Sequence, residues 1–154
     1  MLLLTTLLSS AFAKDLDGRI AVGLNQSVGE IPSLSARFAI PLSQKALEVQ
    51  VGAIIGFDTD PSNISPGFVF GLRGFYGLIV EDNMNILAGG CIAYISDNGS
   101  PTVRLQPSLE SQVFLMGLDN LSLAPSIGLD IDFGNGNTKF SVGGSFMGSV
   151  HYWF

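Results

Sequence analysis

Charged side chains are scarce in this sequence. They make up 13% of its 154 residues, about half of the roughly 25% that is usual for soluble domains. Hydrophobic residues reach 47%, and the mean hydropathy is +0.43. The seven lysines and arginines stand singly along the chain, so no basic patch is available to neutralise a phosphate backbone. These values exclude a disordered chain and argue against nucleic-acid binding.

Cysteine is nearly absent, and the composition does not favour helices. Cys91 is the only cysteine, which excludes an internal disulfide and a zinc site built from cysteines. Glycine contributes 19 residues and proline 7, and both residue types destabilise the interior of a helix. The composition therefore argues against a helical bundle.

Long apolar runs are missing beyond the first 13 residues. The longest, 86–95, has ten residues and includes two glycines, whereas a membrane-spanning helix needs about 18 to 20 residues. The chain is thus too apolar for an ordinary soluble domain, yet it has no segment that could cross a bilayer as a helix. A closed β-barrel is the remaining architecture that pairs every backbone polar group inside a membrane.

The first 13 residues have the character of a signal peptide. They are apolar and then small, and they end in Ala11-Phe12-Ala13, the A-x-A form that signal peptidase reads. Cleavage there would leave Lys14 as the new N-terminus. No lysine or arginine precedes the apolar run, so the true start of the signal is open. The alternative is a short buried strand or helix.

Apolar and polar residues alternate with a period of two over most of the chain, which indicates strands. In 105–113, for example, the even positions hold Gln106, Ser108, Glu110 and Gln112. Turn-forming residues divide the chain into strands, which we predict at 19–25, 34–42, 47–57, 67–79, 85–96, 103–115, 121–133 and 138–154. Eight is the smallest common strand count of outer-membrane barrels. The sequence therefore predicts one all-β domain over 14–154, an eight-stranded antiparallel up-and-down transmembrane β-barrel.

The charges of the predicted strands fall on the face opposite the aromatic-rich one. The other residues of that polar face are mainly small, which suits a confined lumen better than a water-facing surface. An isolated buried charge is costly, so the charges are expected to pair inside the barrel. The predicted lumenal charge network comprises Arg37, Glu48, Arg73, Arg104, Glu110, Asp130, Asp132 and Lys139.

Glu110 is the member of this network with the most specific expectation. It should point inward and pair with Arg104, Arg73 or Arg37, because a carboxylate in a narrow barrel needs a cation. An eight-stranded barrel is just wide enough to be filled by its own side chains. The sequence therefore predicts a polar plug and no wide channel.

Three prolines fall within the predicted strands: Pro41, Pro107 and Pro125. Proline cannot donate a hydrogen bond to a neighbouring strand. Each of the three is therefore expected near a rim of the barrel or at a β-bulge.

The end of the chain has a distinctive pattern. Residues 146–154 alternate apolar and other side chains and end in an aromatic residue, with Val150, Tyr152 and Phe154 on one face. This segment resembles the C-terminal strand of bacterial outer-membrane β-barrel proteins, and the whole chain resembles their small eight-stranded OmpA/OmpX-type class. The resemblance implies location in the bacterial outer membrane, contact with its lipids and lipopolysaccharide, and recognition of these three residues by the barrel-assembly machinery.

Candidate catalytic and metal-binding residues are few. His151 has Ser149 two residues away, but no carboxylate stands at a recognisable spacing to complete a nucleophilic site. Asp130, Asp132, Gly134 and Asn137 resemble the start of a calcium loop, but this pattern is also how a strand enters a tight hairpin. Asp58 and Asp60 could gather divalent cations, although a solvated loop explains them as well. We expect no catalytic residue, metal or cofactor.

The function expected from these features is structural, anchoring or interactive, without enzyme activity. The connections expected on the outer side, 26–33, 58–66, 97–102 and 134–137, are all short, which weakens the case for a large adhesive surface. One alternative is a secreted, soluble, lipocalin-like barrel that binds an apolar ligand. A less favoured alternative is a barrel enzyme that modifies lipids.

Overall fold

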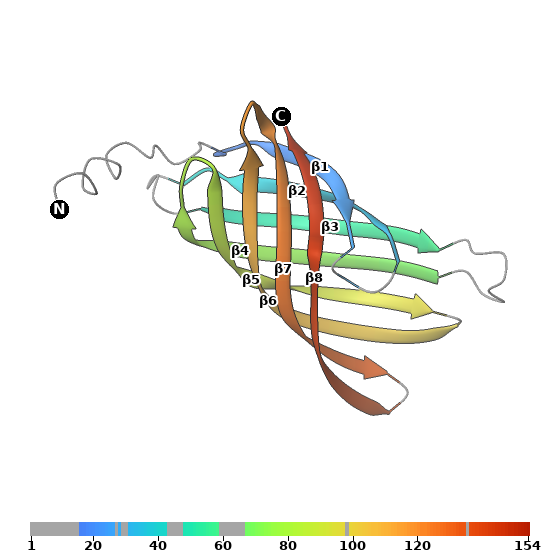
Figure 1. Cartoon of the computed structure of the whole chain (residues 1–154). Helices are drawn as coiled ribbons and strands as arrows, with labels where there is room; N and C mark the ends of the chain where they lie inside the picture. Colours follow the sequence, from blue (N-terminus) through green and yellow to red (C-terminus); the bar gives the residue numbers. More distant parts are fainter. Residues whose placement is uncertain are drawn as a thin grey trace.

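The chain forms a closed barrel of antiparallel strands in which each strand pairs with its neighbours in sequence and the last pairs with the first (Figure 1). The computed structural model describes residues 16–26, 28, 31–42, 48–58, 67–97, 99–134 and 136–154, and only the backbone for residues 97 and 143–147. The predicted signal peptide and its cleavage site lie outside these residues. Within them, no helix has the length and apolar character needed to cross a membrane.

Eight strands make up the described barrel, as the alternation predicted. They are β1 (Ile20–Asn25), β2 (Ser33–Ile40), β3 (Val49–Asp58), β4 (Gly67–Val80), β5 (Met84–Asp97), β6 (Ser100–Leu115), β7 (Leu118–Gly134) and β8 (Asn137–Trp153). The all-β class and the up-and-down order are confirmed. The largest differences in the strand ends are at the starts of β6 and β7, where 103 and 121 were predicted and the strands begin at Ser100 and Leu118.

The up-and-down order places the start of β1 and the end of β8 at the same end of the barrel, here called the C-terminal end. The β1–β2, β3–β4, β5–β6 and β7–β8 connections lie at the opposite end. The wall is uneven there, because β1 stops at Asn25, opposite Ser149 of β8. The β7–β8 pair continues to Gly134↔Asn137 and projects well away from the C-terminus (Figure 1).

The prolines interrupt the sheet in different ways. Pro41 follows the last residue of β2, and Pro125 lies at the irregularity between Ala124 and Ser126 of β7, so the prediction is confirmed for both. It is wrong for Pro107, which lies in the middle of β6 opposite Gly90. The β6–β7 register has no partner for Pro107, so the missing N–H falls where no ladder bond is made.

The lumen is layered, and the polar plug expected from the sequence occupies only part of it. One apolar cluster lies towards the opposite end and contains Val28, Ile31, Ile54, Val69, Cys91, Ala93 and Ile95. A second lies at the C-terminal end and contains Leu16, Ala21, Ala39, Phe114 and Trp153. Buried polar side chains from Arg37 to His151 fill the region between them. The sequence did not resolve these layers because 67–79 and 85–96 are largely apolar on both faces.

Candidate functional site

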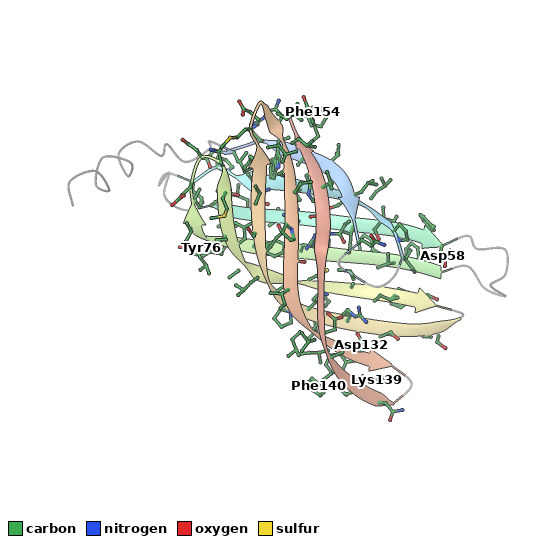
Figure 2. The ribbon with its side chains drawn as sticks, viewed as in Figure 1. Asp58, Tyr76, Asp132, Lys139, Phe140 and Phe154 are labelled. Atoms are coloured by element: carbon green, nitrogen blue, oxygen red, sulfur yellow. The ribbon has the colours of Figure 1, made fainter. Side chains whose placement is uncertain are left out.

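The outer face of the barrel wall carries many exposed apolar side chains. Outward positions hold large apolar side chains that are exposed, among them Leu24 at 64% and Ile127 at 60%. Figure 2 shows Tyr76 and Phe140 directed away from the barrel. Charged strand residues with described side chains take the alternate, inward positions, apart from Asp119 beside the β6–β7 turn and Lys139, which has inward register but is exposed. The barrel is therefore apolar outside and charged inside.

Glu110 of β6 lies at the centre of the lumen, within the register that the sequence predicted. Arg37 of β2 donates to both of its carboxylate oxygens, from Nη1 to Oε1 and from Nη2 to Oε2, the latter at 2.8 Å. Arg73 of β4 donates from Nη2 to Oε2 at 3.3 Å. Both guanidinium groups also lie over the ring of Phe75, at 5.4 and 5.0 Å from its centroid. Two of the three candidate arginines, Arg37 and Arg73, thus contact Glu110.

Glu48 has amide partners instead of an arginine. It accepts hydrogen bonds from Gln50 Nε2 and from Asn85 Nδ2, the second at 2.8 Å. Gln50 and Asn85 both donate to Gln112 Oε1, at 3.0 and 3.2 Å. Gln50 Oε1 also accepts from Arg37 at 3.3 Å. The amides therefore connect Glu48 to the Glu110 cluster across the lumen.

Arg104, Asp130 and Asp132 form a separate group towards the opposite end. Arg104 donates to Asp132 from Nε and Nη2, at 2.6 and 2.8 Å, and lies 3.1 Å from Asp130 through Nη1. Gln106 donates to the other oxygen of Asp130 at 2.6 Å. Lys139 is in register with Asp132 but is exposed on the projecting hairpin (Figure 2). The eight predicted charges thus divide into groups instead of forming one network, and Lys139 lies outside the lumen.

His151 pairs with a serine that the sequence did not single out. Its Nε2 lies 2.9 Å from Ser35 Oγ, whereas Ser149 Oγ accepts from Arg37 Nη2 at 3.0 Å. His151, Ser35 and Ser149 are all buried. Among the residues that the structure describes, His151 Nδ1 has no hydrogen-bond partner, so no described carboxylate orients the ring as a nucleophilic site requires.

The acidic residues considered for calcium have other partners. Asp130 and Asp132 both lie against Arg104, which supplies the positive charge that a cation would bring. Among the described residues, no group of three or more His, Cys, Asp or Glu side chains is placed to hold a metal ion. The candidate cation site of Asp58 and Asp60 lies partly outside the described residues, because Asp60 is not among them.

The last residues of β8 alternate across the wall. Tyr152 and Phe154 point outward, with Phe154 67% exposed, and their rings meet edge to face at 5.0 Å. Val150 is half-buried on the same face. Trp153 points inward and donates from Nε1 to Ser122 Oγ at 3.0 Å. Phe154 lies at the C-terminal end of the barrel (Figure 2). The role of Val150, Tyr152 and Phe154 in assembly stays a prediction.

Several lumenal residues were missed by sequence reasoning. Gln50 lies two positions from Glu48, so the period of two that placed Gln112 on the polar face with Glu110 would have found it as well. Phe75 gave no signal, because an aromatic residue in a mixed apolar strand does not reveal that it lies beneath two guanidinium groups. No protein-family model, curated protein or solved structure matches the chain.

Proposed function

We propose that this chain is a β-barrel protein of the bacterial outer membrane, with a structural, anchoring or interaction role and a lumen closed by its own side chains. The single observation that carries the proposal is the polarity of the barrel. Many of its outward side chains are large, apolar and exposed, while Arg37, Glu110 and Arg73 are buried inside. Lipid-facing positions of a membrane barrel require that distribution, since Arg or Lys at the midplane costs about 2–4 kcal/mol.

A secreted lipocalin-like barrel would need the reverse distribution. Its wall would meet water, where a contiguous apolar patch above a few hundred Å² is rare on a monomer. Its lumen would be an apolar cavity for the ligand, whereas the centre of this lumen holds ion pairs and hydrogen-bonded amides. The fold alone suits both classes, and the placement of charge favours the membrane barrel.

The proposed partners follow from this apolar outer face and from the proposed membrane location. Membrane lipids, including lipopolysaccharide, would contact the outer wall, and the barrel-assembly machinery would act on Val150, Tyr152 and Phe154. The C-terminal end would face the periplasm and the opposite end the exterior. The lumen has no proposed cofactor, and the chain has no proposed nucleic-acid partner.

Fractionation of the producing bacterium tests the proposal. The protein should sediment with outer membranes on a density gradient, resist a urea or carbonate wash, and leave the pellet only with detergent. Unheated samples should migrate differently from boiled ones in gels, because a closed barrel resists detergent. Recovery in the soluble fraction without detergent would contradict the proposal and favour the lipocalin-like alternative.

A further inference from the structure

The seam where β1 meets β8 is the shortest ladder of the described barrel. It runs from Ala21↔Trp153 to Asn25↔Ser149, whereas the β5–β6 ladder runs from Met84↔Val113 to Asp97↔Ser100. Free energies of local opening are lowest where few backbone bonds and contacts hold a segment. The seam is therefore the place where the closed wall has the least backbone support.

The two strands also approach each other unusually closely. A Cβ atom built on Gly23 of β1 would lie 1.8 Å from the carbonyl oxygen of Val150 in β8. Real side chains do not tolerate that distance, so the seam closes in this form only because residue 23 is glycine.

Arg19 braces this seam from its C-terminal end. It immediately precedes β1 and donates from Nε to the carbonyl oxygen of Phe154 at 3.0 Å. Its Nη2 donates to the carbonyl oxygen of Trp153 at 3.0 Å and to Asn120 Oδ1 of β7 at 2.7 Å. One guanidinium group thus connects the start of β1 with the end of β8 and with β7. Hydrogen bonds from a charged donor are stronger than those between neutral groups.

An apolar cluster lies directly behind the brace. Trp153 is fully buried there, against Leu16, Ala21, Ala39 and Phe114. The backbone N–H of Phe154 also donates to the carbonyl oxygen of Ile20 at 2.8 Å. Separation of β1 from β8 would uncover this cluster, so Trp153, the single tryptophan of the chain, reports on the state of the seam.

We propose that the β1–β8 seam is a lateral gate in the barrel wall and that Arg19 is its latch, a positioning residue that sets how often the seam opens. The inference does not depend on the proposed membrane location, because it concerns opening of the folded barrel in whichever solvent holds it.

Hydrogen exchange of the full chain tests the latch. In Arg19→Ala, the backbone amides that point across the seam, those of Val22, Leu24, Val150 and Tyr152, should exchange about tenfold faster than in the wild type, because the variant loses three charge-assisted bonds. Amides of the β4–β5 ladder should keep their wild-type rates. Arg104→Ala is the matched control, since it removes an arginine that joins β6 and β7 and should leave the seam amides unchanged.

Trp153 fluorescence and a disulfide across the seam provide two further measurements. Arg19→Ala should expose Trp153, which would appear as a red shift of its fluorescence and faster quenching by acrylamide. A disulfide between Val22→Cys and Tyr152→Cys, which are register partners across the seam, should abolish both effects in a Cys91→Ser background.

If Arg19→Ala fails to fold, Asn120→Ala removes one bond of the latch and should give a smaller increase in the exchange rates of the same amides. Unchanged seam amides, or equal acceleration in β4–β5, would overturn the latch.

Discussion

At the scale of single residues, Glu110 is the centre of a buried three-charge cluster with Arg37 and Arg73. Its side chain is fully buried, and two guanidinium groups share its carboxylate. Removing one partner of a buried ion pair leaves the others without compensation, which costs more than the pair itself contributes. The stability of the barrel should therefore depend strongly on this one carboxylate.

The Glu110→Gln variant tests that dependence. It keeps the shape of the side chain but removes the negative charge that Arg37 and Arg73 share, so the free energy of unfolding should fall by roughly 3–5 kcal/mol. Urea unfolding followed by Trp153 fluorescence measures the change. Lys139→Gln is the control, because this exposed lysine should contribute less than about 0.5 kcal/mol. Equal effects of the two substitutions would contradict a buried ion-pair centre.

Side-chain parity predicted the inward position of Glu110, but the same rule was insufficient for Lys139. Both residues occupy inward register, but they differ in whether other strands surround them. Glu110 lies where the wall is closed on all sides, whereas Lys139 lies on the part of β8 that extends past the end of β1 at Asn25. Parity gives the direction of a side chain. Whether that side chain is enclosed depends on the lengths of the other strands around the barrel.

At the scale of elements, the backbones of β4 and β5 approach each other unusually closely. A Cβ atom on Gly89 would lie 2.0 Å from the carbonyl oxygen of Gly74 and 2.7 Å from Cα of Phe75. A Cβ atom on Gly74 would meet no atom within 4 Å. Gly89 is in register with Phe75, and Gly74 with Gly90. The two glycines thus lie on neighbouring pairs of one ladder but differ completely in the space around them.

This contrast gives a matched pair of variants. Gly89→Ala should lower the free energy of unfolding by about 1–3 kcal/mol, since the backbones must separate to admit the methyl group. Gly74→Ala should be neutral or slightly stabilising, because alanine has fewer unfolded conformations to lose. Thermal or urea unfolding of both variants checks the prediction. A Gly74→Ala variant as unstable as Gly89→Ala would refute the close approach.

The last strand, β8, carries the predicted assembly signal. Replacing Phe154 with Asp should reduce the amount of inserted protein far more than Lys14→Ala, because it places a charge on the exposed apolar face that Phe154 shares with Tyr152. Quantifying the protein in washed outer membranes measures the difference. Wild-type membrane levels of the Phe154→Asp variant would refute the assembly-signal interpretation.

The strands themselves were predictable because the period of two persists through most of them. The position of Pro107 was not, because it depends on which ladder bonds β6 makes to β7. The short β1–β8 seam was also hidden, since it depends on the pairing of elements far apart in the sequence. Local alternation determines a strand, while the register between strands depends on packing around the whole barrel.

At the scale of the whole molecule, the described side chains of the lumen form layers of different chemistry. Charged and amide side chains occupy its centre, and apolar clusters occupy both sides of them. Reconstituted protein should therefore show little or no ion conductance in planar bilayers. Glu110→Ala should not by itself produce a steady large pore, because the apolar clusters remain. A large steady conductance of the wild type would refute the closed lumen and indicate a pore function.

The central claim, that the outer wall contacts lipid, is tested most directly by fluorescence quenching in vesicles whose lipids carry bromine on the acyl chains. The two samples are the wild type, in which Trp153 is buried, and Ile127→Trp in a Trp153→Phe background, which places the single tryptophan on the outer face. We predict strong quenching of the tryptophan at position 127 by brominated lipid, weak quenching by aqueous iodide, and little quenching of Trp153 by either. Strong quenching at position 127 by iodide, with none by brominated lipid, would contradict the membrane barrel.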